Sequence, residues 1–282
     1  WRTVNKQYRK LENDASGYEE FVTKRMNLPK VDLEKNVTDW EKIVGTNQPY
    51  DLESLRGREC IASIDYASIR DFVACGLMFV KEGKYILPKE LTQSFVCKPF
   101  VDKHYGYSRE KSQGNGKKDH RKFAPIKEWE DDGLITVLDK DSMDPFLVVQ
   151  WFVDRRDEGW NIKKVIGDSF RMEILKPIFE NEGFDVEVIR NPDAAAALLA
   201  PRIELGFDEG DIIWGDNPMQ RWYTNNVLVQ FNPRGEKVYR KKEKTKRKTD
   251  GFMMFLYAMW ASRDLEEYHA GDALDIMGSM DF

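Results

Sequence analysis

The order of the predicted strands and helices is the feature that most constrains this chain. Three strand-like runs, at 60–65, 71–80 and 84–96, follow one another across short turns, and Gly83 lies in the second turn. Apolar runs bounded in this way predict an antiparallel meander. Later in the chain helices and strands alternate, and a strand, a crossing helix and a second strand predict parallel pairing. The sequence therefore predicts an α/β fold built on a mixed sheet flanked by helices.

Local signals place the elements of the second half. Asp144 before Pro145 and Asn191 before Pro192 are suited to the start of a helix, and an apolar strand between these two sites ends at Asp168. Residues 211–240 predict an added β-hairpin with a Pro-Arg-Gly turn, and the run 252–261 is apolar all round, which predicts a buried final helix. A meander followed by parallel strands and helices is the element order of a ribonuclease H-like fold.

Composition divides the chain into three parts. Residues 1–58 are polar and helix-like, with proline breaks, and predict a helical linker or lead-in segment. Residues 59–265 are predicted to form the α/β domain, in which 98–141 is a polar insertion, and residues 266–282 a C-terminal tail. Because the chain begins at Trp1 without a methionine, we expect it to be a piece of a longer polypeptide.

Composition also argues against several classes of protein. No window approaches the ~18 consecutive apolar residues of a membrane-spanning helix, and the polar N-terminus is unlike a signal peptide. The three cysteines are widely spaced and include no Cys-x-x-Cys pair, which argues against a disulfide framework or a thiolate zinc site. The chain has three scattered histidines, so any metal here is expected to be a hard cation on oxygen ligands.

Three aspartates lie where this topology brings chain segments together. Asp65 is at the end of the first strand, Asp168 at the end of the fourth, and Asp250 at the start of the last helix. When the first strand lies beside the fourth, their ends meet at the switch point where open α/β sheets bind ligands. Buried carboxylates are costly unless a positive charge or a metal meets them. Three carboxylates can hold two Mg²⁺ or Mn²⁺ ions for phosphodiester hydrolysis, so these are the predicted catalytic and metal-binding residues.

Each aspartate also has a purely structural interpretation. Asp168 and Asp250 are equally suited to cap the helices that begin beside them, because aspartate is common at such positions. Asp65 is compatible with a solvated strand face. Asp71, which opens the second strand, is a candidate auxiliary ligand or a turn residue. The coincidence of three aspartates at three converging places favours the metal site.

Two basic runs on an acidic chain predict a surface for a polyanion. The net charge is −5, yet seven of the nine residues from Arg240 to Lys248 are basic, and five more basic residues lie between Lys111 and Lys122. Such runs are often solvated loops, but the first leads directly into Asp250, where the phosphates of a cut strand would pass. The predicted DNA-binding residues are Arg240, Lys241, Lys242, Lys244, Lys246, Arg247 and Lys248, with Lys117, Lys118 and Arg121 as further candidates.

Several segments together resemble one family. They are FVTKRMNL, SIDYASIRDFVACGLMF, WEDDGLITV, VIGDSF, NPMQRWYTNNV and KTDGFMMFLYAM. In these segments the chain is similar, from about Tyr18 to Leu265, to the nuclease domain of the large terminase subunit of tailed bacteriophages. The resemblance would place the family's metal-binding aspartates on Asp65, Asp168 and Asp250, and its asparagine-ending hairpin on NPMQRWYTNNV. One departure is Trp214, where relatives often have a histidine, so no role of that histidine carries over.

The resemblance implies a metal-dependent endodeoxyribonuclease that cuts concatemeric viral DNA during genome packaging in the host cell cytoplasm. It implies two divalent cations, Mg²⁺ or Mn²⁺, as cofactors and double-stranded DNA as substrate. The implied partners are an upstream packaging ATPase domain of the same polypeptide, the portal protein and the small terminase subunit, with no membrane. No G-x-x-x-x-G-K-[ST] motif occurs in the chain, so we do not expect it to hydrolyse ATP.

The residues leave three alternatives open. Another ribonuclease H-like nuclease, of the resolvase or transposase type, would use the same carboxylates. An actin-like ATP-binding fold also begins with an aspartate-bearing meander, but it needs Gly-rich phosphate-binding turns that GDSFR lacks. A non-catalytic DNA- or portal-docking module would keep the fold around a decayed site.

Overall fold

The computed structural model describes residues 35–68, 71–108, 124–243 and 245–265. The predictions for most of the linker and for the tail, and those for Lys117, Lys118, Arg121 and Lys244, lie outside these residues. Among the described residues, no helix combines the length and the apolar character needed to cross a membrane.

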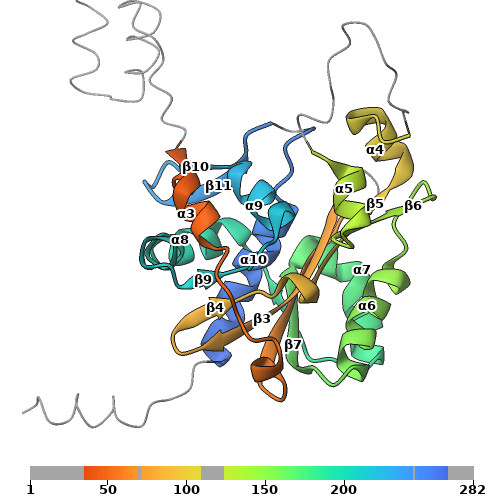
Figure 1. Ribbon diagram of the computed structural model, residues 1–282, viewed down its shortest axis with the longest axis horizontal. Coiled ribbons are helices and arrows are strands. Elements are labelled where there is room, and N and C mark those ends of the chain that lie inside the picture. The colour runs from red at the N-terminus through yellow and green to blue at the C-terminus, as the bar shows by residue number, and fades with distance from the viewer. Residues whose placement is uncertain (1–34, 69–70, 109–123, 244, 266–282) are drawn as a thin grey trace, which may run out of the picture. The chain divides into compact units, whose positions relative to one another are not determined.

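A mixed sheet with the strand order β6-β5-β3-β2-β7-β8 forms the centre of the domain (Figure 1). Its strands are β2 (Glu59–Asp65), β3 (Val73–Lys81), β5 (Thr92–Cys97), β6 (Ile135–Leu138), β7 (Asn161–Asp168) and β8 (Val186–Ile189). The pairs β2–β3 and β3–β5 are antiparallel, whereas β5–β6, β2–β7 and β7–β8 are parallel. The predicted meander, the parallel strands and the ribonuclease H-like fold are therefore confirmed.

The third predicted strand is divided in two. Pro88 separates β4 (Lys84–Ile86) from β5, and the short 3-10 helix η3 (Lys89–Leu91) lies between them. Proline cannot donate a ladder hydrogen bond, which explains the break. Glu82 and Gly83 join β3 to β4 with φ angles of 53° and 76°, as a two-residue type I′ turn requires. β4 then pairs in parallel with β9 (Ile212–Ile213).

The added hairpin is shorter than the sequence predicts. Its strands β10 (Val227–Phe231) and β11 (Lys237–Lys241) are antiparallel and flank the Pro-Arg-Gly turn, as expected. The preceding residues form helix α9 (Pro218–Asn225), whose N-cap Asn217 accepts a hydrogen bond from the amide of Gln220. The prediction of a hairpin over NPMQRWYTNNV is therefore wrong, because Asn-Pro starts a helix there. A second sheet has the order β1-β10-β11, with β1 at Lys35–Asn36.

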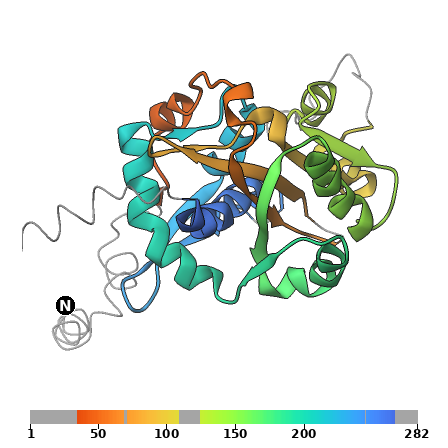
Figure 2. The same cartoon turned by 90° about the horizontal axis from the view of Figure 1, so that it is seen from below.

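Helices cover both faces of the central sheet, as Figure 2 shows. One face carries α6 (Pro145–Asp157) and α7 (Ser169–Asn181), and the other carries α8 (Pro192–Glu209) and α10 (Asp250–Ala261). The described ranges also contain the helices α3 (Trp40–Gly45), η2 (Glu53–Leu55), α4 (Lys98–Tyr105), α5 (Ile126–Asp131) and η5 (Ser262–Asp264). Asp144 and Asn191 cap α6 and α8 as predicted. Nearly every side chain of α10 is buried, also as predicted.

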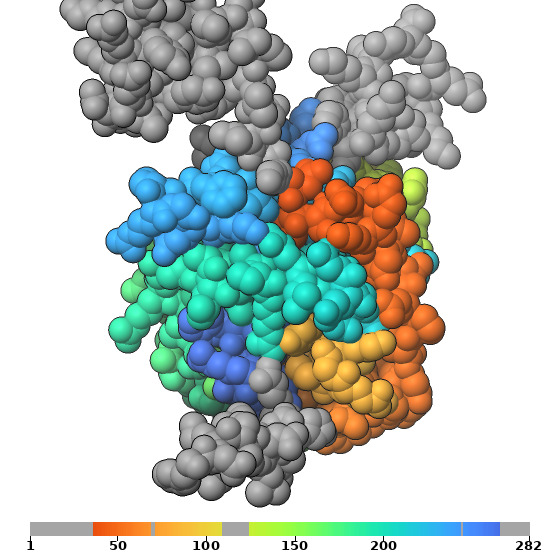
Figure 3. All heavy atoms as spheres, turned by 90° about the vertical axis from the view of Figure 1, so that its left-hand side faces the viewer, coloured from red at the N-terminus to blue at the C-terminus, as the bar shows by residue number. Residues whose placement is uncertain are grey.

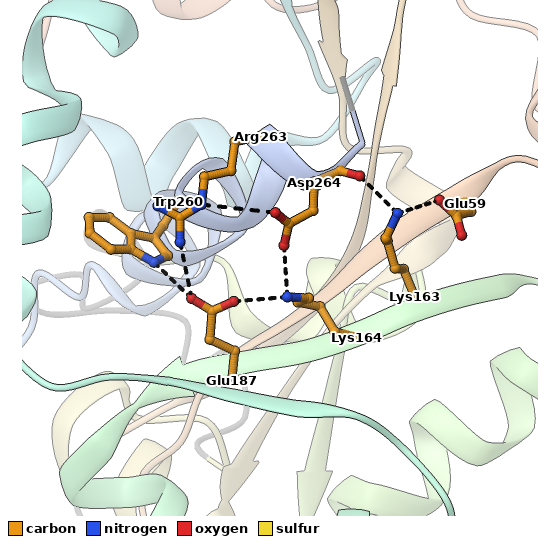
Figure 4. A network of polar contacts seen from close by, with 7 residues as sticks. All are labelled: Glu59, Lys163, Lys164, Glu187, Trp260, Arg263 and Asp264. Carbon is orange, nitrogen blue, oxygen red and sulfur yellow. Dashed lines mark hydrogen bonds and ion pairs between the residues drawn. The ribbon is translucent and has the colours of Figure 1, made fainter. Parts of the chain in front are cut away.

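A polar network fixes the carboxyl end of α10 (Figure 4). Lys164 on β7 lies 3.0 Å from Glu187 on β8 and 2.7 Å from Asp264, just beyond the helix. The indole of Trp260 donates a 3.0 Å hydrogen bond to the same Glu187. Because α10 packs along β2, β3 and β7, holding this end places its first residue, Asp250, at the opposite end of the strands.

We expect Gly251→Ala to destabilise the domain. A Cβ on Gly251 would overlap the ring of Tyr223 and lie 2.7 Å from Gln220 Oε1, so α9 and α10 would have to separate. Overpacking of this kind costs about 1–3 kcal/mol of unfolding free energy. The measurement is urea unfolding of both proteins. Gly45→Ala is the matched control, because its Cβ meets no atom within 4 Å and alanine favours a helix. If both substitutions change the unfolding free energy by the same amount, steric overlap at Gly251 is not the cause.

Candidate active site

Strand alternation places two of the predicted aspartates on one face. On β2, Ala62 and Ile64 pack towards α6 and α7, whereas Ile61 packs towards α10. Side chains along a strand alternate between its two faces, so Asp65, four residues after Ile61, lies on the same side as α10. The same reasoning applies to Asp168, which lies two residues after Ile166 of the α10-side core. Because β2 and β7 are adjacent and parallel, both carboxylates lie at the same edge of the sheet, and α10 adds Asp250 there.

Asp250 is the most buried of these residues. Its exposed fraction is 3%, and its Oδ2 atom has no hydrogen-bond partner among the described residues. Asp250 is the first residue of α10 and Thr249 is its N-cap, so Asp250 does not occupy the capping position that the structural interpretation assigned to it. Burial, and next the charge of Asp71, raise its pKa to about 7. A buried carboxylate oxygen without a partner is costly when ionised, and a cation beside it would remove that cost.

Asp65 and Asp168 complete the predicted set. Desolvation raises the pKa of Asp65 well above its usual value, and the negative charge of Asp250 adds to the rise. Asp168 Oδ1 accepts a 3.0 Å hydrogen bond from the amide of Arg171, so Asp168 does cap α7. One carboxylate oxygen makes that cap, and the other is compatible with a metal. The negative charges of Asp250 and, to a smaller extent, Asp168 both contribute to the raised pKa of Asp65.

Two lysines of the basic run lie inside this cluster. Lys241 Nζ is 2.7 Å from Asp71 Oδ2 and 3.8 Å from Asp250 Oδ1. Lys248 Nζ is 2.9 Å from Asp71 Oδ1, and its residue is 2% exposed. Burial raises the pKa of Asp71, but the charges of Lys241 and then Lys248 outweigh that effect, so the pKa lies below its usual value. We call the four aspartates Asp65, Asp71, Asp168 and Asp250 the carboxylate cluster, and Lys241 and Lys248 are its lysine partners.

Sequence reasoning did not assign Lys241 and Lys248 to this cluster, although their nearness to Asp250 in the chain was a signal. It placed both on a DNA-binding surface. Arg240 also has an internal partner, because its guanidinium lies 2.7 Å from both carboxylate oxygens of Asp193 on α8. Lys242 donates a hydrogen bond to the carbonyl of Asn225. The side chains of Lys246 and Arg247 are partly exposed.

The cluster has the ligand type of a hard divalent cation, but its side chains are not arranged around one. Its possible ligands are carboxylate oxygens, which Mg²⁺ and Mn²⁺ prefer, and the unpartnered Oδ2 of Asp250 supplies a buried acceptor. Within the part of the chain that the structure describes, no three His, Cys, Asp or Glu side chains are grouped closely enough to hold a metal ion. The positive charges that meet these carboxylates here are the two lysines.

Comparison with known proteins establishes the fold. No family model and no curated protein sequence matches this chain. Its structure is similar to that of the HK97 bacteriophage large terminase, with a TM-score of 0.67 and 15% identity, over 91% of this chain and 49% of that one. Two weaker likenesses are the large terminase nuclease of thermophilic phage G20c with bound magnesium (TM-score 0.46, 11% identity, 80% of this chain and 96% of that one) and the nuclease domain of Thermus phage P74-26 large terminase (0.42, 10%, 81% and 95%).

The molecule is thus a ribonuclease H-like α/β protein with an acidic cluster at the carboxyl ends of its central strands. More particularly, it shares its fold with part of the HK97 large terminase, and it spans about half the length of that protein. The expected resemblance is confirmed at the level of the fold.

The raised pKa of Asp250 predicts how the stability of the metal-free protein depends on pH. Between the usual carboxyl pKa and about 7, the folded state binds more protons at Asp250 than the unfolded state, so its contribution to stability falls as pH rises through that window. We therefore expect Asp250→Asn to be more stable than the wild type at pH 8 by about 1 kcal/mol or more, and to gain much less at pH 5.

Urea unfolding in EDTA at the two pH values measures this difference. Asp193→Asn is the control, because its partner Arg240 lowers its pKa and it is ionised at both pH values. The effect of that control on stability should not change between pH 5 and pH 8. If the change in stability caused by Asp250→Asn is also the same at pH 5 and pH 8, the pKa of Asp250 is not raised in the folded protein.

Proposed function

We propose that this chain is a metal-dependent endodeoxyribonuclease that cuts concatemeric viral DNA during genome packaging. The observation that carries the proposal is the buried and unpartnered Oδ2 of Asp250, in a ribonuclease H-like fold whose adjacent parallel strands β2 and β7 end in Asp65 and Asp168. The fold similarity to the HK97 large terminase supports it.

Asp65, Asp168 and Asp250 would bind two divalent cations, Mg²⁺ or Mn²⁺. When bound, such cations supply Lewis-acid chemistry for in-line hydrolysis of a phosphodiester. The chain itself orients the ligands. The amide of Arg171 fixes one oxygen of Asp168, and the packing of α10 on β2 and β7 fixes Asp250. Asp71 is held between Lys241 and Lys248, so we assign it to positioning these lysines.

Double-stranded DNA is the proposed substrate, and the site of action is the host cell cytoplasm. Because the chain spans about half of the HK97 protein, we infer that a packaging ATPase domain belongs to the same polypeptide. The portal protein and the small terminase subunit are the further partners that the proposal includes.

A non-catalytic DNA- or portal-docking module is the second candidate. One observation favours it: ammonium groups already meet Asp71 and Asp250, so part of the acidic charge is neutralised within the chain. Such a module would bind DNA or portal without cutting DNA under any metal condition.

Plasmid cleavage with Mg²⁺, Mn²⁺ or EDTA separates the two candidates. We expect cleavage that depends on the metal and tolerates any sequence, and a loss of about 100-fold or more in each of Asp65→Asn, Asp168→Asn and Asp250→Asn, because each removes a charge that would hold the cations. Asp208→Asn is the control, since Asp208 is largely exposed and pairs with Lys42 on α3. Full activity in EDTA would refute metal dependence, and a variant that cuts normally would remove its residue from the site.

The remainder of the basic run, apart from Arg240, Lys241 and Lys248, is expected to bind phosphates. Lys241 and Lys248 are paired internally, so the test replaces Lys242, Lys244, Lys246 and Arg247 with Gln. Duplex affinity should fall, and the slope of log affinity against log salt should flatten by up to about 0.9 for each phosphate that the variant no longer neutralises. Turnover at saturating DNA should change little, because these residues are not among the proposed cation ligands.

The matched control removes the same charge elsewhere. It replaces Lys42, Lys84, Lys140 and Lys176 with Gln. A salt slope that changes equally in both quadruple variants would mean that the run is a solvated loop and that the DNA path lies elsewhere.

A further inference from the structure

We infer that Lys241 is an internal counter-cation of Asp71 and Asp250, and that its ammonium group competes with a divalent cation for Asp250. This inference rests on the proposed metal site. It assigns Lys241 a positioning role that controls cation affinity, in place of the phosphate contact that the sequence predicts.

The first step is the place of the ammonium group. Lys241 Nζ lies 2.7 Å from Asp71 and 3.8 Å from Asp250, so its charge is shared between two carboxylates. It also acts on Asp65. Its side chain is 32% exposed, and Asp250 is 3% exposed. In such a partly buried setting, charges at these distances interact more strongly than in bulk water.

The second step is that the backbone of Lys241 is anchored. It is the last residue of β11 and pairs with Val227 on β10. The preceding Arg240 binds Asp193 on α8 through two hydrogen bonds of 2.7 Å, and Lys237 pairs with Glu204 on the same helix. Figure 3 shows the hairpin lying along α8. The position of Lys241 is therefore fixed by a strand that is anchored on α8, unlike that of a lysine on a solvated loop.

The third step is a contrast between the two lysines. Lys248 is enclosed: it is 2% exposed, its ammonium is 2.9 Å from Asp71, and it lies 4.7 Å from the centre of the Phe100 ring. Lys241 has a close partner in Asp71 and a looser one in Asp250. Lys241 can therefore leave Asp250 and keep Asp71, whereas Lys248 is a fixed partner. Asp71 retains the displaced ammonium group.

The consequence is a competition between cations. A positive charge near a carboxylate lowers its affinity for any other cation by the same Coulomb interaction that shifts a pKa by about 1–3 units. Removing the charge of Lys241 should therefore strengthen divalent cation binding. It should also destabilise the metal-free protein, because the carboxylates lose a neutralising partner.

The test is calorimetric titration of the whole chain with Mn²⁺ in the absence of DNA, together with melting curves in EDTA and in Mn²⁺. We expect Lys241→Gln to bind Mn²⁺ about tenfold more tightly or better, to melt at a lower temperature in EDTA and to gain more from Mn²⁺ than the wild type. Lys241→Arg keeps the charge and should bind Mn²⁺ like the wild type. Lys237→Gln is the matched control on the same strand, because Lys237 pairs with Glu204 outside the cluster.

A folded Lys241→Gln protein with unchanged or weaker Mn²⁺ affinity would overturn the inference. If Lys241→Gln is unfolded in EDTA, folding on addition of Mn²⁺ supports the inference, and failure to fold in saturating Mn²⁺ overturns it. The proposed function fails in a different way. In that case neither the wild type nor Lys241→Gln binds Mn²⁺, and the wild type does not cut DNA.

Discussion

Repulsion between carboxylates at one edge of the sheet is the constraint on which the arrangement around the site depends. The charges of Asp250, Asp168 and Asp71 all act on Asp65, and burial makes the ionised forms of Asp65, Asp71 and Asp250 more costly. A fold that brings such groups together must supply positive charge. In this chain two lysines, Lys241 at the end of β11 and Lys248 shortly before α10, supply positive charge to Asp71.

The rest of the domain holds the cluster in place against that repulsion. The carboxyl end of α10 is tied to β7 and β8 through Lys164, Glu187 and Asp264. The amino end of α10 is held by a hydrogen bond from α9, in which Gln220 Nε2 donates to the carbonyl of Gly251 at 3.0 Å. Since both ends of α10 are held, Asp250 has little freedom to move away from Asp65.

Much of the site could be predicted from sequence because it follows from topology. The strand runs and helix signals determine which segments are parallel neighbours, and the ends of parallel neighbours lie at one edge whatever the side-chain details. Asp65 and Asp168 could be placed in this way. The division of the third strand and the helix α9 were missed, although Pro88 and the Asn217-Pro218 pair are recognisable signals. In the first case the apolar pattern outweighed the proline signal, and in the second the family resemblance placed a hairpin over NPMQRWYTNNV.

The inward direction of Lys241 could not be predicted, because it depends on a partner 170 residues away in sequence, Asp71. Within RKKEKTKRK every basic residue looks equally suited to phosphate. The structure separates them: Arg240 is bound to Asp193 on α8, Lys241 to the carboxylate cluster and Lys242 to a backbone carbonyl. A basic run beside an acidic site thus satisfies internal charge before it offers any to a ligand. Composition gives the total charge of such a run, and only the fold determines how much of it remains available to DNA.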